Sequence, residues 1–347
     1  YQDRGAIFQT SSDSELIVHL LADPEWEPER DPLAEALRRV EGAYSLVMMD
    51  SDQLIAARDP HGFRPLSLGR LDDGYMVASE TCAFDLLEAE GVREIEPGEI
   101  VRIDENGVES TRIMPKAKCR PAMCIFEYIY FARPDSSIGG QSVHATRLKL
   151  GEKLAEEHPV DADLVTSVPD SGNSAALGYA RASGIPPDSG FIRNHYVGRT
   201  FITPAEEARA SKVKIKLNVV RDVVEGKRVV VVDDSIVRGT TSKERIHCLR
   251  DAGAKEVHLR ISAPPIRCPC YFGIDFAEAE ELIAADRSVE EIRDFLNVDS
   301  LGYQTVEGLE EAVPGSGGSY CRACFTGDYP VKVEETMHKY ALEQGQG

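Results

Sequence analysis

Residues 229–232 are four consecutive valines, and they constrain the fold of this chain more than any other stretch. A run of β-branched apolar residues predicts a strand that is buried on both faces, as in the parallel sheets of α/β proteins. Asp233 and Asp234 follow the run directly. Because ligands of open α/β sheets bind at the carboxyl ends of the strands, these two acids are candidates for a binding site.

The residues after the two acids predict a phosphate-binding turn. A short loop, residues 235–239, precedes a helical pattern from about Thr240 to Ala252, with Gly253 as its C-cap and hydroxyls that can cap its start. Backbone N–H groups and the positive end of a helix dipole attract phosphate, and neighbouring carboxylates can hold ribose hydroxyls or Mg²⁺. The stretch suits a phosphorylated sugar bound with a metal. A buried strand that merely ends in solvated acids is the alternative.

This segment resembles the phosphoribosyl pyrophosphate (PRPP) signature of type I phosphoribosyltransferases, whose fold is an α/β domain with a parallel sheet. The resemblance implies that the two acids engage ribose hydroxyls and Mg²⁺ and that backbone amides hold the 5′-phosphate. The residues of this segment expected to bind PRPP are Asp233, Asp234, Ser235, Ile236, Val237, Arg238, Gly239, Thr240 and Thr241.

The composition of the whole chain limits its partners. Its 347 residues are enough for two ordinary domains, and a net charge of −20 argues against a nucleic-acid partner, which requires basic patches. No apolar run is long enough to span a membrane, and no signal peptide is visible. Eight cysteines without a secretory signal indicate a reducing compartment, so we expect a cytoplasmic protein.

Residues 1–117 predict an α+β arrangement. Thr10 to Glu15 form a capping-box-like start to an apolar-striped helix, and a second helix covers Leu33 to Val40. Short strands separated by turn-rich segments follow. These strands are Tyr44–Met49, Gln53–Ala57, Pro65–Gly69, Tyr75–Ala78 and Glu99–Ile103.

Four segments of this half (5–15, 42–46, 57–66 and 78–85) resemble class II glutamine amidotransferase domains, which have an N-terminal-nucleophile (Ntn) hydrolase fold. In that family the Asp of a Ser-Asp-x-Glu motif holds the α-amino group of glutamine, which implies this role for Asp13; a helix N-cap is the alternative. The family's nucleophile is an N-terminal Cys, whereas residue 1 is Tyr1 and the first cysteine is Cys82. We therefore expect a fragment without the catalytic nucleophile that does not hydrolyse glutamine as it stands.

A glutaminase domain followed by a PRPP signature resembles the glutamine PRPP amidotransferase family over essentially the whole chain. The resemblance implies an enzyme that makes phosphoribosylamine from PRPP and glutamine or ammonia, the first committed step of purine synthesis. It also implies a homotetramer that purine nucleotides inhibit. The expected parts are a partial Ntn-type glutaminase domain at 1–117, an α/β type I phosphoribosyltransferase domain at 118–310, and a C-terminal segment at 311–347.

Two more segments match the family's transferase domain. Residues 126–131 alternate aromatic side chains as a strand does, and a helix is expected from about His144 to Glu157. Residues 164–176 predict a strand, a tight turn and a helix start, and they resemble the family's pyrophosphate loop. The resemblance places Ser171 at the Mg²⁺ site together with Asp233 and Asp234, while an ordinary turn is the alternative.

Residues 193–202 match the family's flexible loop, which closes over PRPP. Arg193, Tyr196 and Arg199 are the expected PRPP contacts, and the arginines place local positive charge in an acidic chain. His195 stands where the family often has Arg, which leaves its role open. Closure would exclude water from an oxocarbenium-like transition state and a labile product.

The C-terminal third contains a Cys-x-x-Cys pair, which indicates a metal site. One branch of the resembling family carries a [4Fe–4S] cluster on four cysteines, and this implies the ligands Cys124, Cys270, Cys321 and Cys324. Zinc would also fit thiolate ligands. Cys119 and Cys268 lie near these positions and have no assigned role.

Two other functions share the PRPP signature. A nucleobase-salvage phosphoribosyltransferase would have the PRPP loop without the glutaminase motifs, and a PRPP-sensing regulatory protein would keep the loop without catalysis. The metal and flexible-loop motifs favour the amidotransferase.

Overall fold

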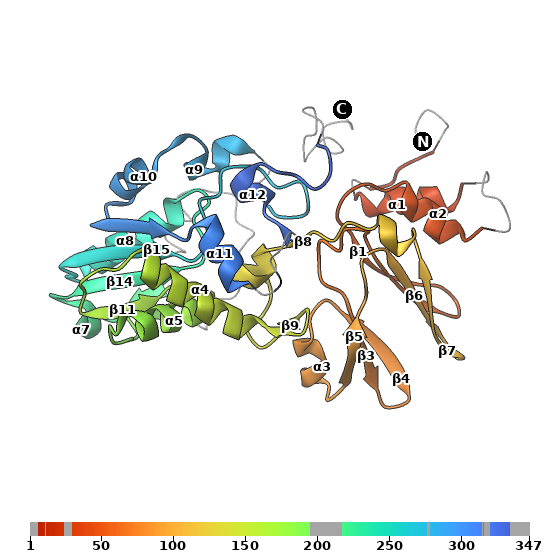
Figure 1. Ribbon diagram of the computed structural model, residues 1–347, viewed down its shortest axis with the longest axis horizontal. Coiled ribbons are helices and arrows are strands. Elements are labelled where there is room, and N and C mark those ends of the chain that lie inside the picture. The colour runs from red at the N-terminus through yellow and green to blue at the C-terminus, as the bar shows by residue number, and fades with distance from the viewer. Residues whose placement is uncertain are drawn as a thin grey trace.

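The computed structural model describes residues 6–10, 12–23, 30–194, 217–275, 278–313, 315 and 320–333. Figure 1 shows two lobes, an N-terminal lobe of antiparallel strands and a C-terminal lobe built on a parallel sheet. The amidotransferase-type half and the transferase-type half thus differ in architecture as the sequence predicts. The predicted boundaries at residues 117 and 310 stay predictions.

The N-terminal lobe contains two small antiparallel sheets with strand orders β1-β2-β6-β7 and β4-β3-β5. Two of its strands, β5 and β7, are not predicted by the sequence, because few of their side chains are buried and they lack an apolar alternation. The helices and strands of this lobe are α1 (Ser14–Leu21), α2 (Pro32–Arg38), β1 (Ser45–Met49), β2 (Leu54–Arg58), β3 (Ser67–Leu71), β4 (Gly74–Ala78), α3 (Cys82–Leu86), β5 (Glu90–Glu94), β6 (Glu99–Asp104) and β7 (Gly107–Arg112).

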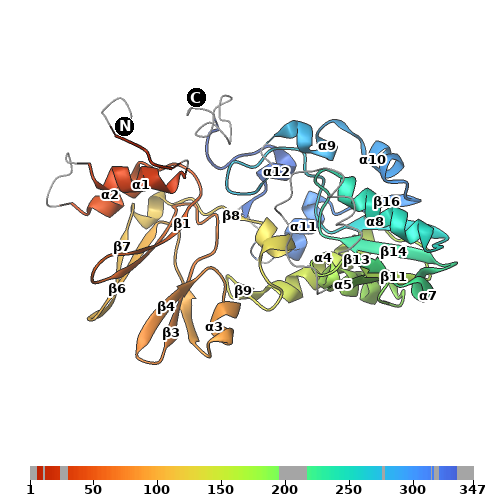
Figure 2. The ribbon, with the colours of Figure 1, turned by 180° about the vertical axis from the view of Figure 1, so that it is seen from behind.

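The C-terminal lobe is organised by four parallel strands in the order β11-β14-β15-β16. Figures 1 and 2 show α8 and α10 on one side of this sheet and α4 and α5 on the other. The elements that frame the sheet are α4 (Val143–Glu157), β11 (Leu164–Ser167), α5 (Asn173–Ser183), β14 (Arg228–Asp233), α8 (Thr240–Asp251), β15 (Glu256–Ile261), α10 (Val289–Leu296), β16 (Ser300–Tyr303) and α11 (Val306–Ala312).

The valine run forms β14 and is fully buried, which confirms the predicted strand. Val229 and Val231 belong to one core cluster with Ile246 of α8, while Val230 and Val232 belong to a second cluster with Tyr179 of α5. Successive side chains point to opposite faces of a strand, so each face of the sheet receives two valines. An apolar run without alternation is what burial on both faces requires.

Residues 126–131 do not form the strand that their aromatic alternation predicted. They include the one-turn π-helix η3 (Glu127–Phe131). The buried guanidinium of Arg147 on α4 donates to the backbone oxygens of Tyr128 at 2.6 Å and Ala132 at 2.8 Å. These carbonyls therefore need no partner strand, and the prediction was wrong because the stabilising donor comes from a distant helix.

The two lobes meet where β8 (Met123–Cys124) leaves the N-terminal lobe. The backbone N–H of Cys124 donates to the carbonyl of Phe63 at 2.9 Å. The carboxylate of Glu80 accepts from the backbone N–H of Arg133 and the hydroxyl of Ser136, each at 2.7 Å. Hydrogen bonds from two parts of the N-terminal lobe thus hold the segments on either side of η3.

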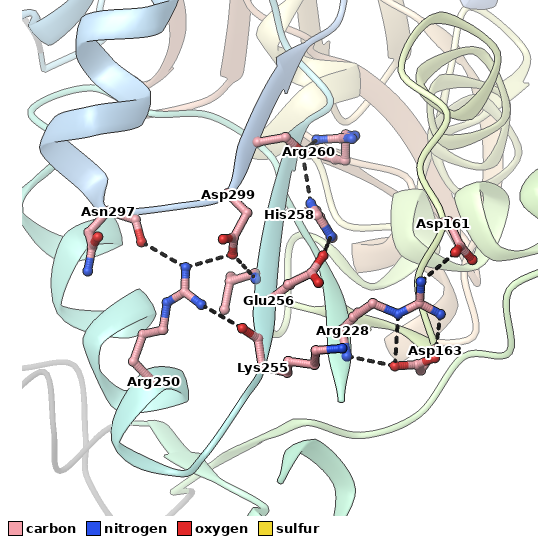
Figure 3. Close-up of polar contacts among 12 residues, drawn as sticks. Asp161, Asp163, Arg228, Arg250, Lys255, Glu256, His258, Arg260, Asn297 and Asp299 are labelled. Atoms are coloured by element: carbon pink, nitrogen blue, oxygen red, sulfur yellow. Dashed lines mark hydrogen bonds and ion pairs between the residues drawn. The ribbon is translucent and has the colours of Figure 1, made fainter. Parts of the chain in front are cut away.

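The amino edge of the parallel sheet is closed by ion pairs, which Figure 3 shows in detail. Arg228 at the start of β14 pairs with Asp161 and Asp163, and Arg250 near the end of α8 contacts Asp299 at 2.6 Å. These charges lie at the edge opposite to the carboxyl ends of the strands, which are left for a ligand.

Helices α4 and α5 cross so closely that glycine is required at the crossing. A Cβ atom on Gly178 would lie 2.0 Å from the backbone oxygen of Leu148. Ala is normally the better helix former by about 1 kcal/mol, but here it would force the helices apart, which costs about 1–3 kcal/mol. We expect Gly178→Ala to lower the Tm by several degrees. Gly74→Ala, where the nearest atom would be 3.6 Å away, is the control and should leave the Tm nearly unchanged; equal Tm values for both variants would contradict the close crossing.

Candidate functional site

The carboxyl edge of the sheet brings together two loops that are more than 60 residues apart in the chain. The loop after β11 packs on the end of β14, because a Cβ on Gly172 would lie 2.6 Å from the backbone oxygen of Val232. The N–H of Val168 donates to that same oxygen at 2.9 Å. The loop that resembles the pyrophosphate loop therefore lies directly beside the two acids.

Asp233 is the last residue of β14, and its carboxylate is almost fully buried. One oxygen accepts a hydrogen bond from Nη1 of Arg245 at 2.8 Å, and the other accepts from the backbone N–H of Asp234 at 3.0 Å. Burial raises the pKa of the Asp233 carboxyl above its usual range, while the charge of Arg245 lowers it. Asp233 is thus fixed by two donors of the protein.

Asp234 has a different set of partners, both of them rotatable hydroxyls. One carboxylate oxygen accepts from Ser171 at 2.5 Å and the other from Ser235 at 2.5 Å. The structure therefore joins Ser171 to the acid with which sequence analysis grouped it. A hydroxyl group can rotate away from Asp234 without any change in the backbone. Asp234 is therefore the acid that can more easily exchange its hydrogen-bond partners.

The loop after the acids ends at Gly239, which has a φ of +76° and is the N-cap of α8. A Cβ there would lie 2.6 Å from Cδ1 of Ile283, so both backbone conformation and space require glycine. Within the described part of the chain, no side chain caps this helix end, and the predicted capping by hydroxyls was wrong. The free first-turn N–H groups suit an anion.

The other residues of the loop predicted to bind PRPP differ in their exposure. Ile236 is buried, whereas Arg238, Thr240 and Thr241 are exposed at the loop and helix start. Arg238 pairs with Glu281. Within the loop, Ser235 and Val237 are partly buried and Gly239 is buried.

Arg193 ends the short strand β12 (Phe191–Arg193) and forms an ion pair with Asp170 of the loop that follows β11. This contact places a predicted PRPP residue beside the candidate site. Tyr196, Arg199 and His195 lie outside the described residues.

Four cysteines gather around one pocket at the junction of the lobes. Cys124 on β8 and Cys321 on β17 (Tyr320–Cys321) are register partners of a parallel pair. Cys324 on α12 (Ala323–Thr326) and Cys270 complete the thiols that line it, together with the stacked rings of Phe63 and Phe272. Residues 124, 270, 321 and 324 are thus brought together as the sequence predicts.

The pocket holds the right donors but little room. Burial raises the pKa of the Cys321 thiol to about 11 and raises the pKa values of Cys124 and Cys324 as well, so without a metal these thiols are protonated. The cavity is about 10 Å³, enough for about one water molecule. Across the described ranges, no group of three or more His, Cys, Asp or Glu residues is arranged to hold a metal ion. The donor set suits iron–sulfur or zinc, and the thiols would have to turn outward around either.

Two further cysteines lie close by. Cys268 donates its backbone N–H to the carbonyl of Cys324 at 3.0 Å. Cys119 lies against Gly98 in the N-terminal lobe. Neither thiol is among the residues that line the pocket.

Asp13 is the N-cap residue of α1, but its side chain makes no capping hydrogen bond within the described residues. The carboxylate of Glu15 instead accepts from the backbone N–H groups of Gln9 at 2.7 Å and Thr10 at 2.8 Å. The side chain of Asp13 is exposed, and Glu15 rather than Asp13 accepts the hydrogen bonds at the start of this helix. Its predicted role toward glutamine stays a prediction.

Sequence reasoning missed two charged groups near these sites. Arg245 lies one turn after Thr241 on α8, and helical spacing would have placed it on the same side of the helix. Glu127 carries a buried carboxylate 3.1 Å from Nη1 of Arg64, across the junction of the lobes. No sequence pattern connects residues 64 and 127, because only the packing of the lobes brings them together.

Comparison with known proteins identifies the family. A family model described as a glutamine amidotransferase domain matches residues 1–85. The amidophosphoribosyltransferase of Bacillus subtilis is 50% identical over 347 residues, which cover 99% of this chain and 72% of that protein. The chain belongs to the amidophosphoribosyltransferase family.

Other family members agree with this assignment. Amidophosphoribosyltransferase 1 of Arabidopsis thaliana, a chloroplastic protein, is 52% identical over 97% of this chain. The chain spans 60% of the length of that relative. A solved structure of the B. subtilis enzyme complexed with ADP and GMP matches 96% of this chain and 74% of its own, at 50% identity and a TM-score of 0.89. A structure described as the allosteric regulatory enzyme of purine biosynthesis matches equally well, with a TM-score of 0.89.

The fold of the family accounts for the two lobes: an amidotransferase domain and a phosphoribosyltransferase domain with a parallel sheet. Among the described helices, none is long and apolar enough to cross a membrane.

The buried carboxylate of Glu127 at the lobe junction predicts a pH-dependent stability. Burial raises the pKa of Glu127 from 4.5 to about 7, although Arg64 opposes the shift. Between these values the folded state keeps a proton that the unfolded state has lost, so stability falls as the pH rises from about 4.5 to 7. We expect Glu127→Gln to exceed the wild-type stability by less than about 1 kcal/mol at pH 5 and by about 3 kcal/mol at pH 8, with a correspondingly larger difference in Tm at pH 8.

Thermal unfolding at the two pH values measures this difference. Glu156→Gln, which changes an exposed carboxylate on α4, is the matched control and should follow the wild type at both. A Glu127→Gln variant whose Tm differs from the wild type equally at pH 5 and pH 8 would contradict the raised pKa.

Proposed function

We propose that the chain carries the transferase part of an amidophosphoribosyltransferase, the enzyme that catalyses the first committed step of purine synthesis. The complete reaction converts PRPP, glutamine and water into 5-phosphoribosylamine, glutamate and pyrophosphate. The observation that carries the proposal is the hydrogen bond that joins Ser171 to Asp234 at the carboxyl edge of the sheet, in a chain that is 50% identical to a family member. Two loops with the family's motifs thus form one site.

The residues of this site have distinct tasks in the proposed reaction. Asp233 and Asp234 bind the ribose hydroxyls, and the backbone N–H groups from Ile236 to Thr241 hold the 5′-phosphate at the free end of α8. Arg193 and the loop after β11 face the pyrophosphate. Tyr196 and Arg199 are assigned to PRPP by their motif alone.

The site also suits Mg²⁺, since its side chains offer oxygen donors. Asp233, Asp234 and Ser171 would hold the ion, and with so few protein ligands the phosphates of PRPP would supply the rest. Bound there, Mg²⁺ would neutralise charge on the departing pyrophosphate.

For the pocket at the lobe junction we propose a [4Fe–4S] cluster on Cys124, Cys270, Cys321 and Cys324. Its four thiols come from the start of the C-terminal lobe, from the segment after β15 and from the end of the lobe, so the cluster would tie the C-terminal segment to the junction. Zinc is the alternative that the same donors allow.

Further proposals concern the N-terminal lobe, the inhibitors and the assembly of the protein. The lobe would be part of an Ntn-type glutaminase domain, with Asp13 in its glutamine pocket. The B. subtilis relative is described as complexed with ADP and GMP, which supports purine nucleotides as inhibitors. A homotetramer in the cytoplasm remains a prediction.

The proposed function predicts Mg²⁺-dependent release of pyrophosphate from PRPP when ammonia is the nitrogen donor. We expect Asp234→Asn to lower kcat/KM for PRPP by a factor of ten or more while the Tm stays within a few degrees, because it removes a charge from the site and the rotatable hydroxyls of Ser171 and Ser235 can adjust to the amide. Pyrophosphate release and chromatographic detection of the product measure this. Asp161→Asn, at the opposite edge of the sheet (Figure 3), is the control.

The outcomes separate the candidate functions. A salvage phosphoribosyltransferase would require a nucleobase in place of ammonia, and a PRPP sensor would bind PRPP without releasing pyrophosphate. Wild-type kinetics in Asp234→Asn would reject the assignment of this acid.

The cysteine pocket predicts a bound metal cluster. We expect anaerobically purified protein to be brown and to contain about four iron and four sulfide per chain. Cys324→Ser should lose the colour and lower the Tm, because metal binding contributes to folding, whereas Cys248→Ser on α8 should keep both. Iron, sulfide and zinc analysis measure the content. Colourless protein with one zinc per chain would favour zinc, and four free thiols would reject both metals.

A further inference from the structure

We propose that Arg245 is a positioning residue of the PRPP site, which fixes Asp233 in advance and leaves Asp234 as the acid that changes partners when the ligand binds. This inference rests on the proposed function and deepens it. It concerns a residue outside the PRPP signature loop, one turn further along α8.

The contacts of Asp233 carry the first part of the argument. Its carboxylate is about 5% exposed and meets Nη1 of Arg245 at 2.8 Å. A buried carboxylate without a positive partner is costly, so the arginine offsets part of the cost of burying the Asp233 charge and orients the group. The second carboxylate oxygen accepts from the backbone N–H of Asp234, which sets the plane of the group.

The contacts of Asp234 carry the second part. Its two oxygens accept from the hydroxyls of Ser171 and Ser235 and not from a charged donor. The bond between Arg245 and Asp233 has charge on both partners, whereas a serine hydroxyl brings no charge to Asp234, so a ribose hydroxyl or a cation displaces the serines from Asp234 more easily than it displaces Arg245 from Asp233. The two adjacent acids therefore have unequal roles.

Part of the hydrogen-bonding capacity of Arg245 is unused among the described residues. Its Nε is buried and has no hydrogen-bond partner among the described residues. If Asp233 did not fix the position of the guanidinium, a rotation that gave Nε a hydrogen-bond acceptor would be favourable. The orientation of the side chain is thus governed by Asp233.

The same helix provides a matched control. Arg250 lies five residues after Arg245 on α8 and contacts Asp299 at 2.6 Å, but at the amino edge of the sheet (Figure 3). It also donates to the backbone oxygen of Lys255 at 3.2 Å. Both arginines form an ion pair with an aspartate of the sheet region, and only the pair of Arg245 lies at the candidate site.

The test measures steady-state kinetics of the full chain with PRPP, Mg²⁺ and ammonia, calorimetric PRPP binding without ammonia, and the Tm. We expect Arg245→Met to weaken PRPP binding and raise KM by roughly tenfold, with little change in kcat, because it removes an orientation that ground state and transition state share. Arg245→Lys should recover part of the affinity, since it restores the charge without the planar fork. Arg250→Met should change the Tm and leave KM unaffected.

A double-mutant cycle shows whether Arg245 acts through Asp233. In an Asp233→Asn background, Arg245→Met should have little further effect on KM. Additive effects, or a wild-type KM in Arg245→Met, would overturn the inference. If Arg245→Met does not fold, Arg245→Lys and its cycle with Asp233→Asn decide the question by the same criterion. A wild-type chain that releases no pyrophosphate from PRPP would reject the proposed function itself, which is a separate result.

Discussion

The structure of this chain depends on one constraint: a strand that is paired on both edges and covered on both faces. β14 is bonded in parallel to β11 and β15, and its valines enter two different core clusters. Burial on this scale leaves no position for a polar side chain within the valine run of the strand. The first polar side chains after the valine run are those of Asp233 and Asp234, which places them at the edge where ligands of such sheets bind.

Electrostatics at the two edges of the sheet are opposite in character. At the amino edge, Arg228 and Arg250 pair with Asp163 and Asp299, which directly precede β11 and β16. At the carboxyl edge, Asp233 is held by a charged donor and Asp234 by hydroxyls. The first edge is closed by its own residues, and the second keeps groups that can exchange partners. This difference explains why a change of charge should affect stability at one edge and ligand affinity at the other.

The junction of the lobes joins the amidotransferase-type half to the segment that precedes α4. The carbonyl of Phe63 accepts a hydrogen bond from the backbone N–H of Cys124 on β8, and the carboxylate of Glu80 accepts from the backbone after η3. Arg147 donates to the carbonyls of that turn from the transferase side. The cysteine pocket lies at the same place, with Phe63 in its wall. The position of this segment is therefore set by both halves of the chain, and a metal on the four thiols would add a further tie.

The sequence by itself determined the elements whose signals are local. The valine run predicted a doubly buried strand, the helical pattern from Thr240 to Ala252 predicted α8 to within one residue, and the motif order indicated an amidotransferase half before a phosphoribosyltransferase half. Tertiary structure alone decided the rest, because the deciding partner is distant in the chain. Residues 126–131 became a π-turn because Arg147 supplies its donors, Glu127 was buried against Arg64 from the other lobe, and Asp233 and Asp234 acquired different partners although they are neighbours. Local pattern specifies which residues form a strand or helix, but the energy of a buried charge depends on what packs against it.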